Sequence, residues 1–480
     1  MKKFYITTSL PYVNAPPHIG FALEIVQADI LARHRRLAGD EVVFNTGTDE
    51  HGLKVYRQAL AEKKDPQAYA DEYAKKFELL KDALNLSYTD FIRTTDPRHM
   101  RAAQEFWRRC EKSGDIEKKA YKIKYCVGCE LEKTDSELTD GRCPVHPNLA
   151  LETIEEENYF FKFSKYQKKL LDFYDGHPDF VVPDFRFNEI RKFVAGGVND
   201  FSISRLKEKM PWGVPVPGDD SHVMYVWFDA LVNYISTLGW PEDEKKFRDF
   251  WPGVQVAGKD NLRQQTAMWQ AMLMSAGLPN SRQVFIHGFV NVAGGKMSKS
   301  VGNVVDPLEL VRAYGTDAVR FWLAREVNPF EDSDFTLERF KESYNANLAN
   351  GLGNFASRVT ALAADTEFVL SKLAVSKEVE QAIADSREAC RRKLAGFAFN
   401  EAITAVLELI RFGDAYVNEK KPWETKDAAV IYDLTVILDN VAALIAPFLP
   451  KTAEAITKCI RHTDGKVSVD RCPTLFPRIA

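Results

Sequence analysis

The chain has 480 residues, too many for one hydrophobic core, so about two to four domains are expected. Its 64 basic and 68 acidic residues leave a net charge of -4, which excludes a protein that coats nucleic acid by charge alone. An apolar share of 45% excludes wholesale disorder. No apolar run approaches membrane-spanning length, and the N-terminus lacks a signal-peptide pattern, so a cytoplasmic protein without membrane contact is expected.

The first elements along the chain predict a parallel crossover unit. Residues 4–10 are predicted as a buried strand, and after a Pro-rich loop residues 20–37 show helical periodicity. A Gly39-Asp40 turn then leads into a second predicted strand at 41–45. Strand, helix and strand of these lengths indicate an α/β fold with a doubly wound parallel sheet of the Rossmann type.

Residues 66–113 are predicted to be helical, and from 118 to 157 the chain is dense in charge and turn residues. This second stretch is typical of an insertion between two halves of a sheet. Helices are predicted at 164–175 and 187–198, a further helix around 264–275, and sheet-like segments at 224–229, 255–257 and 284–290.

Beyond residue 335 the pattern is helical almost to the end. Apolar residues recur at helical spacing in 337–364, 378–397, 399–418 and 427–446, which indicates an all-α bundle of roughly 140 residues. The predicted domains are therefore a first half of the Rossmann-type domain, a connective insertion, a second half of the Rossmann-type domain and a helical domain, at 1–115, 116–222, 223–334 and 335–480.

The insertion contains a candidate metal site. Cys126 and Cys129 are separated by two residues, as are Cys143 and His146, and such spacers let a tight turn present two ligands to one tetrahedral Zn²⁺. Four ligands close the site, so its role is expected to be structural. The other four cysteines are scattered, and the odd total favours a reducing compartment over a disulfide framework.

Two short motifs are suited to binding a nucleoside triphosphate. His18-Ile19-Gly20-Phe21 follows a strand and opens a helix, whose N-terminus attracts phosphate. Lys296-Met297-Ser298-Lys299-Ser300 is a Gly-flanked loop whose lysines can close over phosphates. Alone, the first also suits a helix cap and the second a solvated loop; together, in this order, they indicate adenylate chemistry.

With these motifs the chain resembles the class I aminoacyl-tRNA synthetases, and within them the methionyl enzymes. The similarity covers essentially the whole chain and includes Ser9-Leu10-Pro11-Tyr12-Val13-Asn14, Gly47-Thr48-Asp49-Glu50-His51-Gly52, Tyr225-Val226-Trp227-Phe228-Asp229-Ala230 and Gly258-Lys259-Asp260. The resemblance implies that L-methionine attacks ATP to form an adenylate and that the methionyl group then passes to tRNA(Met), in initiation and elongation. It also implies a zinc knuckle in the insertion.

The resemblance assigns roles at the nucleotide site. His18, Lys296 and Lys299 would be the catalytic phosphate-facing groups, and Gly20, Gly258 and Asp260 would complete ATP binding with Mg²⁺. The sequence departs from the family at Phe21, where a second histidine is usual. More of the phosphate stabilisation is then expected from the lysines and Mg²⁺.

The resemblance also implies an apolar pocket for the methionine side chain, with Asp49 as partner of the ammonium group. Its predicted residues are Leu10, Tyr12, Asp49, Trp227, Ala230, Tyr234 and Gln265. Trp227 lies in a strand-like run, where a lone tryptophan is more often a core residue. Leu231 replaces a common proline and Gln265 a common histidine, so the polar contact in the pocket is expected to differ.

In the helical domain, Asn350, Asn354 and Arg358 are spaced four apart, which places them on one face of a helix. From spacing alone, a solvated face is the simpler interpretation. By the resemblance these residues and Trp423 would recognise a CAU anticodon, with Trp423 as a stacking plane.

Three alternatives remain open: another class I synthetase of the aliphatic group, a non-catalytic synthetase-like protein that binds tRNA, and a zinc-dependent nucleic-acid-binding module. The first generally carries a large editing insertion, for which there is little room here. The second, a protein that has lost catalysis, would have no physical need to keep His18, Lys296, Lys299 and Asp49. The third explains only residues 126–146. A monomer is expected.

Overall fold

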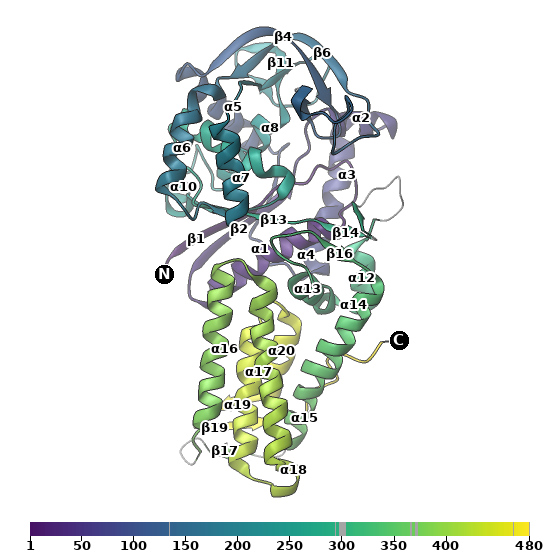
Figure 1. Ribbon diagram of the computed structural model, residues 1–480, viewed down its shortest axis with the longest axis vertical. Helices are drawn as coiled ribbons and strands as arrows, with labels where there is room; N and C mark the ends of the chain where they lie inside the picture. Colours follow the sequence, from purple (N-terminus) through teal and green to yellow (C-terminus); the bar gives the residue numbers. More distant parts are fainter. Residues whose placement is uncertain are drawn as a thin grey trace. The chain divides into compact units, whose positions relative to one another are not determined.

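The computed structural model describes residues 1–133, 135–292, 294–296, 304–364, 367–369, 373–463 and 465–479 (Figure 1). By contact, the chain divides into two compact units. The first comprises Met1–Pro17, Gly39–Leu79 and Tyr88–Ile286, and the second comprises His18–Ala38, Leu80–Ser87 and His287–Ala480. The four-domain division of the sequence stays a prediction.

A six-stranded sheet forms the framework of the first unit and confirms the predicted doubly wound fold. Its order is β3 (Asp90–Arg93), β2 (Glu41–Thr48), β1 (Lys3–Thr8), β12 (Val254–Gly258), β13 (Gln283–His287) and β7 (Val181–Val182). β1 pairs in parallel with both β2 and β12. The strand order reverses between β1 and β12, and ligands of such sheets bind beyond the carboxyl ends of the strands at this point.

The main helices of the first unit connect and cover these strands. Their bounds are α2 (Leu53–Ala61), α3 (Pro66–Glu78), α5 (Pro97–Lys112), α6 (Gln167–Gly176), α7 (Asp184–Ala195), α8 (Val226–Ala230), α9 (Asn233–Ser236), α10 (Glu244–Phe250), the π-helical η4 (Gln264–Met268) and α11 (Trp269–Ser275). The predictions at 164–175, 187–198 and 264–275 are confirmed.

Two predictions in this unit were wrong. Residues 66–113 are not helical throughout, because β3 interrupts them and pairs with β2 from Asn45↔Asp90 to Thr48↔Arg93. The run 224–229 is not a strand: β11 (Asp219–Met224) ends where α8 begins. Four of the five residues of α8 are buried, and burial on nearly every side gives so short a helix the apolar pattern of a strand.

The insertion is built on antiparallel strands that the sequence did not predict. Its four-stranded sheet has the order β5 (Leu131–Lys133), β4 (Ile116–Cys126), β6 (Glu152–Phe161) and β8 (Phe201–Ser202). β4 and β6 pair over ten residues, from Ile116↔Phe161 to Tyr125↔Glu152. The candidate metal ligands lie just beyond the paired end of these two strands.

The second unit contains α1 (Ile19–Leu37), a sheet of β15 (Gly295–Lys296), β14 (Val290–Val292) and β16 (Ser333–Phe335), and the predicted helical bundle. The helices after β15 are α12 (Pro307–Tyr314), α13 (Thr316–Arg325), α14 (Leu337–Ser343), the π-helical η5 (Tyr344–Gly353), α15 (Asn354–Ala363), α16 (Lys377–Ala395), α17 (Phe399–Lys420), α18 (Pro422–Thr425), α19 (Ala428–Ile445) and α20 (Pro450–Cys459). The bundle is not wholly helical, because β17 (Glu367–Val369), β18 (Ile460–Thr463) and β19 (Lys466–Val469) form a small sheet.

A buried ion pair joins α1 to the bundle within the second unit. Arg320 on α13 lies 2.8 Å from the Asp29 carboxylate of α1, and both side chains are fully buried. The guanidinium also donates to the carbonyls of Pro447 and Phe448, which lie just after α19. The helix that begins at His18 is thereby tied to the C-terminal helices.

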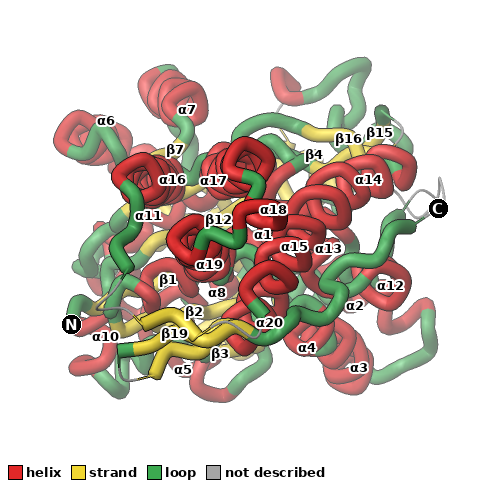
Figure 2. The backbone as a smooth tube through the Cα atoms, turned by 90° about the horizontal axis from the view of Figure 1, so that it is seen from below, coloured by secondary structure: helices red, strands yellow, loops and turns green. Residues whose placement is uncertain are grey.

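α19 corrects the expectation that no apolar run approaches membrane-spanning length. Its 18 residues are long and apolar enough to cross a membrane by length and composition, with a mean hydropathy of 1.8. However, 56% of this helix is buried, and it packs against α15, α16, α17 and α20 (Figure 2). This packing is that of a core helix in a bundle.

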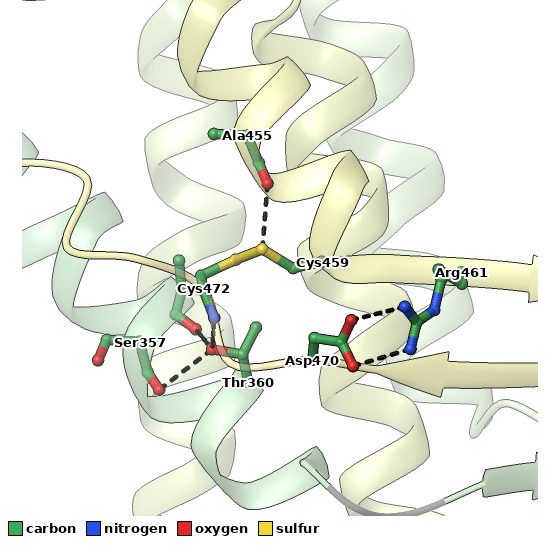
Figure 3. The surroundings of a disulfide bond; sticks show 8 residues. Ser357, Thr360, Ala455, Cys459, Arg461, Asp470 and Cys472 are labelled. Atoms are coloured by element: carbon green, nitrogen blue, oxygen red, sulfur yellow. Dashed lines mark hydrogen bonds and ion pairs between the residues drawn. A yellow bond between two sulfur atoms is a disulfide. The ribbon is translucent and has the colours of Figure 1, made fainter.

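A disulfide between Cys459 and Cys472 corrects the expectation that the scattered cysteines are unpaired (Figure 3). Cys459 ends α20, and the β18–β19 hairpin returns the chain so that the two Cα atoms lie 5.6 Å apart. The backbone N–H of Cys472 donates to Thr360 of α15. The pairing depends on this hairpin, which the sequence did not predict.

Candidate active site

The chain segments that leave β1 and β2 stay paired beyond the sheet. The backbone N–H of Val13 donates to the carbonyl of Asp49 over 3.1 Å, and that of Asp49 donates to Pro11 over 2.9 Å. Tyr12 and Asp49 are therefore bridge partners at the carboxyl edge of the sheet. Gly258 at the end of β12 and Asp260 just after it follow the neighbouring strand, on the other side of the reversal. The predicted residues Tyr12, Asp49, Gly258 and Asp260 thus lie at the edge where α/β sheets bind ligands.

Asp49 has a buried acidic side chain. It is 3% exposed, and its Oδ1 has no hydrogen-bond partner among the described residues. Burial, followed by the charges of Asp229 and Glu130, raises the pKa of Asp49 well above its usual range. A buried acid of this kind is stabilised by a positively charged ligand.

Asp229, whose charge contributes to this shift, is itself held ionised by two histidines. His51 Nδ1 lies 2.8 Å from Asp229 Oδ2, and His99 Nε2 lies 3.5 Å from Oδ1. Burial raises the pKa of Asp229, but the two imidazoles outweigh it and hold the pKa below its usual range. Because Asp229 already has the two histidines as partners, Asp49 is the acid of this pair that is available to a ligand.

Tyr12, the bridge partner of Asp49, contacts a second aromatic side chain. Trp227 on α8 meets Tyr12 edge-on, with ring centroids 6.4 Å apart. Its indole Nε1 donates to the carbonyl of Glu130 over 3.2 Å. Ala230 lies on the same helix as Trp227, and Tyr234 follows on α9. Trp227 is only partly buried, so it is not an ordinary core tryptophan.

Gln265 replaces the common histidine with a fully oriented amide. Its Nε2 donates to the Tyr234 hydroxyl over 2.6 Å, and its Oε1 accepts from Gln255 over 2.9 Å. All three side chains are buried. The sequence did not indicate Gln255, because its role appears only when β12 and η4 are brought together.

In the second unit, His18 is the N-cap of α1. Its Nδ1 accepts from the Gly20 N–H over 3.1 Å, which confirms that His18 caps the helix. In the neutral ring this leaves the proton on Nε2, a donor suited to phosphate. A role in phosphate binding stays a prediction. Phe21 is buried, so the departure from the family pattern places no polar group here.

The lysine motif belongs to the same unit. The backbone of Lys296 pairs with Asn291 on β14, whereas its side chain and residues 297–303, including Lys299, lie outside the described residues. After the motif, the carbonyl of Val305 accepts from the Ile19 N–H over 3.0 Å. The segment following the motif is therefore bonded to the first turn of α1, next to His18.

The four predicted metal ligands come together in the first unit. Their ligand atoms all lie within 4.8 Å of one another, with His146 Nδ1 3.2 Å from Cys129 Sγ and 3.8 Å from Cys126 Sγ. A tetrahedral zinc site has ligand atoms about 3.5–3.8 Å apart, given its bond lengths. A Cβ at Gly128 would lie 2.6 Å from His146 Cγ, so glycine is needed for this approach. The cluster could hold a metal ion.

The predicted anticodon residues lie on η5, α15 and α18. Arg358 lies over the ring of Trp423, 5.1 Å from its centroid, and donates to Asn418 over 2.6 Å. Trp423 is 44% exposed rather than anchored in the bundle. Asn354 is also exposed, and Asn350 lies a turn earlier in the π-helical stretch, where it accepts a bond from Arg478.

A cavity of about 460 Å³ lies elsewhere, at the C-terminal ends of α5 and α11. Arg108, Arg109 and Lys112 line it, and none of the predicted site residues does. Helix C-termini carry partial negative charge that suits these cations, so the basic lining already has a structural explanation.

Comparison with known families agrees with the fold and these motifs. The family model of class I tRNA synthetases (M) matches residues 4–152 and 135–360, and that of the anticodon-binding domain of tRNA ligases matches 376–477. The sheet and the helical domain are thus those of a class I tRNA synthetase.

Individual relatives narrow the assignment. Methionine–tRNA ligase of Thermosynechococcus vestitus is 44% identical, and the match covers 94% of this chain and 89% of the ligase. Methionine–tRNA ligase of Thermotoga maritima is 40% identical, and the match covers 95% of this chain and 74% of the ligase. A solved Mycobacterium tuberculosis methionyl-tRNA synthetase in complex with methionyl-adenylate is 36% identical with a TM-score of 0.93, covering 100% of both chains. The chain belongs to the methionine–tRNA ligase family.

Proposed function

We propose that this protein activates L-methionine with ATP and transfers the methionyl group to tRNA(Met). The observation that carries the proposal is the buried Asp49 side chain, whose Oδ1 has no hydrogen-bond partner among the described residues and whose bridge partner Tyr12 meets Trp227 edge-on. A free α-amino acid with an apolar side chain supplies both missing parts, an ammonium for Asp49 and a surface for the rings. Leu10, Ala230, Tyr234 and Gln265 are proposed to complete the pocket.

The chemistry needs no protein nucleophile. The methionine carboxylate attacks the α-phosphate of ATP, pyrophosphate leaves, and a ribose hydroxyl of tRNA then attacks the acyl carbon and releases AMP. The protein contributes by fixing the reacting groups and by stabilising the charge that develops on phosphate. Asp49 holds the ammonium so that the carboxylate is presented to the nucleotide.

ATP contacts are proposed separately on each unit. In the second unit they are His18, through Nε2–H, together with Gly20, Lys296 and Lys299; in the first they are Gly258 and Asp260. Gly258 lets a ligand approach the end of β12 closely, and the exposed Asp260 carboxylate suits ribose hydroxyls. Mg²⁺ bound with ATP would neutralise part of the phosphate charge.

The cysteine–histidine cluster is proposed to bind one structural Zn²⁺. Three thiolates and one imidazole nitrogen are the ligands that zinc prefers, and four protein ligands leave no open position for catalysis. Zinc would hold together a turn-rich segment.

Replacing Cys143 by Ser is expected to lower the zinc content from one per chain to near zero and to unfold the insertion, because a structural zinc supplies about 10 kcal/mol of local folding energy. Metal analysis and thermal unfolding measure the two effects. Cys390→Ala, on α16, is the matched control and should retain its zinc. A Cys143→Ser variant with one full equivalent of zinc would contradict the assignment.

For tRNA, the proposed contacts are Arg358 and Trp423, with Asn350 and Asn354 beside them. The test is charging of a tRNA transcript with a CAU anticodon against the same transcript with a changed anticodon. We expect methionylation of the first and a large loss with the second. Equal charging of both would refute anticodon recognition by this domain. A monomeric state and a cytoplasmic location stay predictions.

A further inference from the structure

The turn that carries the metal ligands Cys126 and Cys129 also touches the proposed methionine pocket. Tyr125, Tyr225 and Val226 form a small buried cluster, against which Tyr12, Val127 and Trp227 pack. Residues of the knuckle turn and of the pocket wall therefore share one apolar contact. This contact lies wholly within the first unit.

Glu130, directly after the ligand Cys129, makes the polar contacts across this junction. Its carbonyl accepts from the Trp227 indole over 3.2 Å and from the Tyr225 hydroxyl. Its carboxylate accepts from the backbone N–H of Lys54, at the start of α2, and from the Tyr125 hydroxyl. The side chain is buried, so these bonds are not exchanged for bonds to water.

The backbone conformation of Glu130 is set by the turn. Its φ is 51°, in the left-handed region that non-glycine residues rarely adopt. This conformation aims the carbonyl at Trp227 while the carboxylate faces α2. A second contact runs beside it, because Lys54 Nζ reaches the Gly128 carbonyl over 3.3 Å and lies 5.4 Å from the Tyr12 ring centroid.

We propose that Glu130 is a positioning residue that transmits the geometry of the metal-bound turn to Trp227 and so sets the affinity for methionine. The inference rests on the proposed methionine pocket. Glu130 is neither one of the four clustered ligand residues nor one of the proposed pocket residues. A metal ion that fixes Cys129 fixes the carbonyl one residue later, and this carbonyl holds the indole against Tyr12.

The test measures methionine binding directly, by equilibrium dialysis with radiolabelled methionine, together with zinc content and the KM for ATP. Glu130→Ala is expected to weaken methionine binding about tenfold or more, because it removes hydrogen bonds to a buried charge, while zinc and the KM for ATP stay unchanged. Tyr225→Phe removes one donor to the Glu130 carbonyl without loss of apolar volume and should weaken binding severalfold. Glu155→Ala, an exposed carboxylate of β6 paired with Lys122, is the matched control.

The coupling to the metal is tested by a double comparison. Removing zinc from the wild-type protein, which is expected to unfold the insertion, should weaken methionine binding at least as much as Glu130→Ala does. Zinc-free Glu130→Ala and zinc-free wild type should then bind methionine equally well, within about twofold. Unchanged binding in both Glu130→Ala and Tyr225→Phe, or losses that multiply, would overturn the inference. A wild-type protein that bound no methionine would instead overturn the proposed function.

Discussion

Replacing Asp49 by Asn raises the KM for methionine roughly 100-fold, with little change in the KM for ATP. The expectation follows from burial: removing one partner of a buried, hydrogen-bonded charge pair costs about 2–5 kcal/mol. The measurement is methionine-dependent pyrophosphate exchange at saturating ATP. Asp172→Asn, on the exposed face of α6, is the matched control and should behave as wild type.

The same residue makes methionine binding depend on pH. Because burial and the neighbouring carboxylates raise the pKa of Asp49 in the free protein, its carboxyl group becomes neutral as the pH falls through that raised value. The neutral form cannot pair with an ammonium, so methionine affinity falls on the acid side. Asp49→Asn should bind weakly at every pH and lose this dependence. A variant that kept the wild-type pH dependence would contradict the role of Asp49.

Replacing Trp423 by Ala lowers kcat/KM for tRNA charging about 10- to 100-fold and leaves pyrophosphate exchange unchanged. Stacking of a base on an aromatic ring is worth about 1–3 kcal/mol. Trp423 is exposed, and Arg358 lies over its ring, so the pair presents a flat, cationic surface. Measuring tRNA charging and pyrophosphate exchange on the same preparation shows whether only charging is affected.

Two further variants control the tryptophan result. Leu337→Ala, another exposed apolar residue of the second unit, should leave charging unchanged, and Trp423→Phe should retain part of it. If Trp423→Ala reduced exchange and charging alike, its effect would be on folding and the proposed contact with tRNA would be wrong.

The elements that the sequence predicted well are those with a strong local pattern. β1, α1 and β2 were predictable from an apolar run, a 3.6-residue periodicity and a turn, and the bundle helices α16, α17 and α19 from their periodicity. The clustering of Cys126, Cys129, Cys143 and His146 was predictable because two short spacers are themselves local. The prediction of a strand at α8 failed because burial on nearly every side of this short helix removes the helical periodicity.

Other features depend on contacts between distant residues. Nothing local distinguishes Gln255 or Glu130 from any other polar residue of a strand or turn. Their roles arise from Gln265, ten residues later on η4, and from Trp227, which is far away in the chain. The Cys459–Cys472 bond likewise needed the β18–β19 hairpin. His18 was predictable in part. Its motif was recognisable from the sequence, but the sequence left open whether His18 caps the helix, as its bond to Gly20 shows, or binds phosphate.

The most direct measurement is ATP–pyrophosphate exchange with each of the twenty amino acids in turn. Exchange that depends on methionine, with the other amino acids at background, is the predicted result, and it should be lost in Asp49→Asn at low methionine concentration. Exchange with a different amino acid, or no exchange with methionine, would contradict the assignment of the pocket around Asp49, Tyr12 and Trp227.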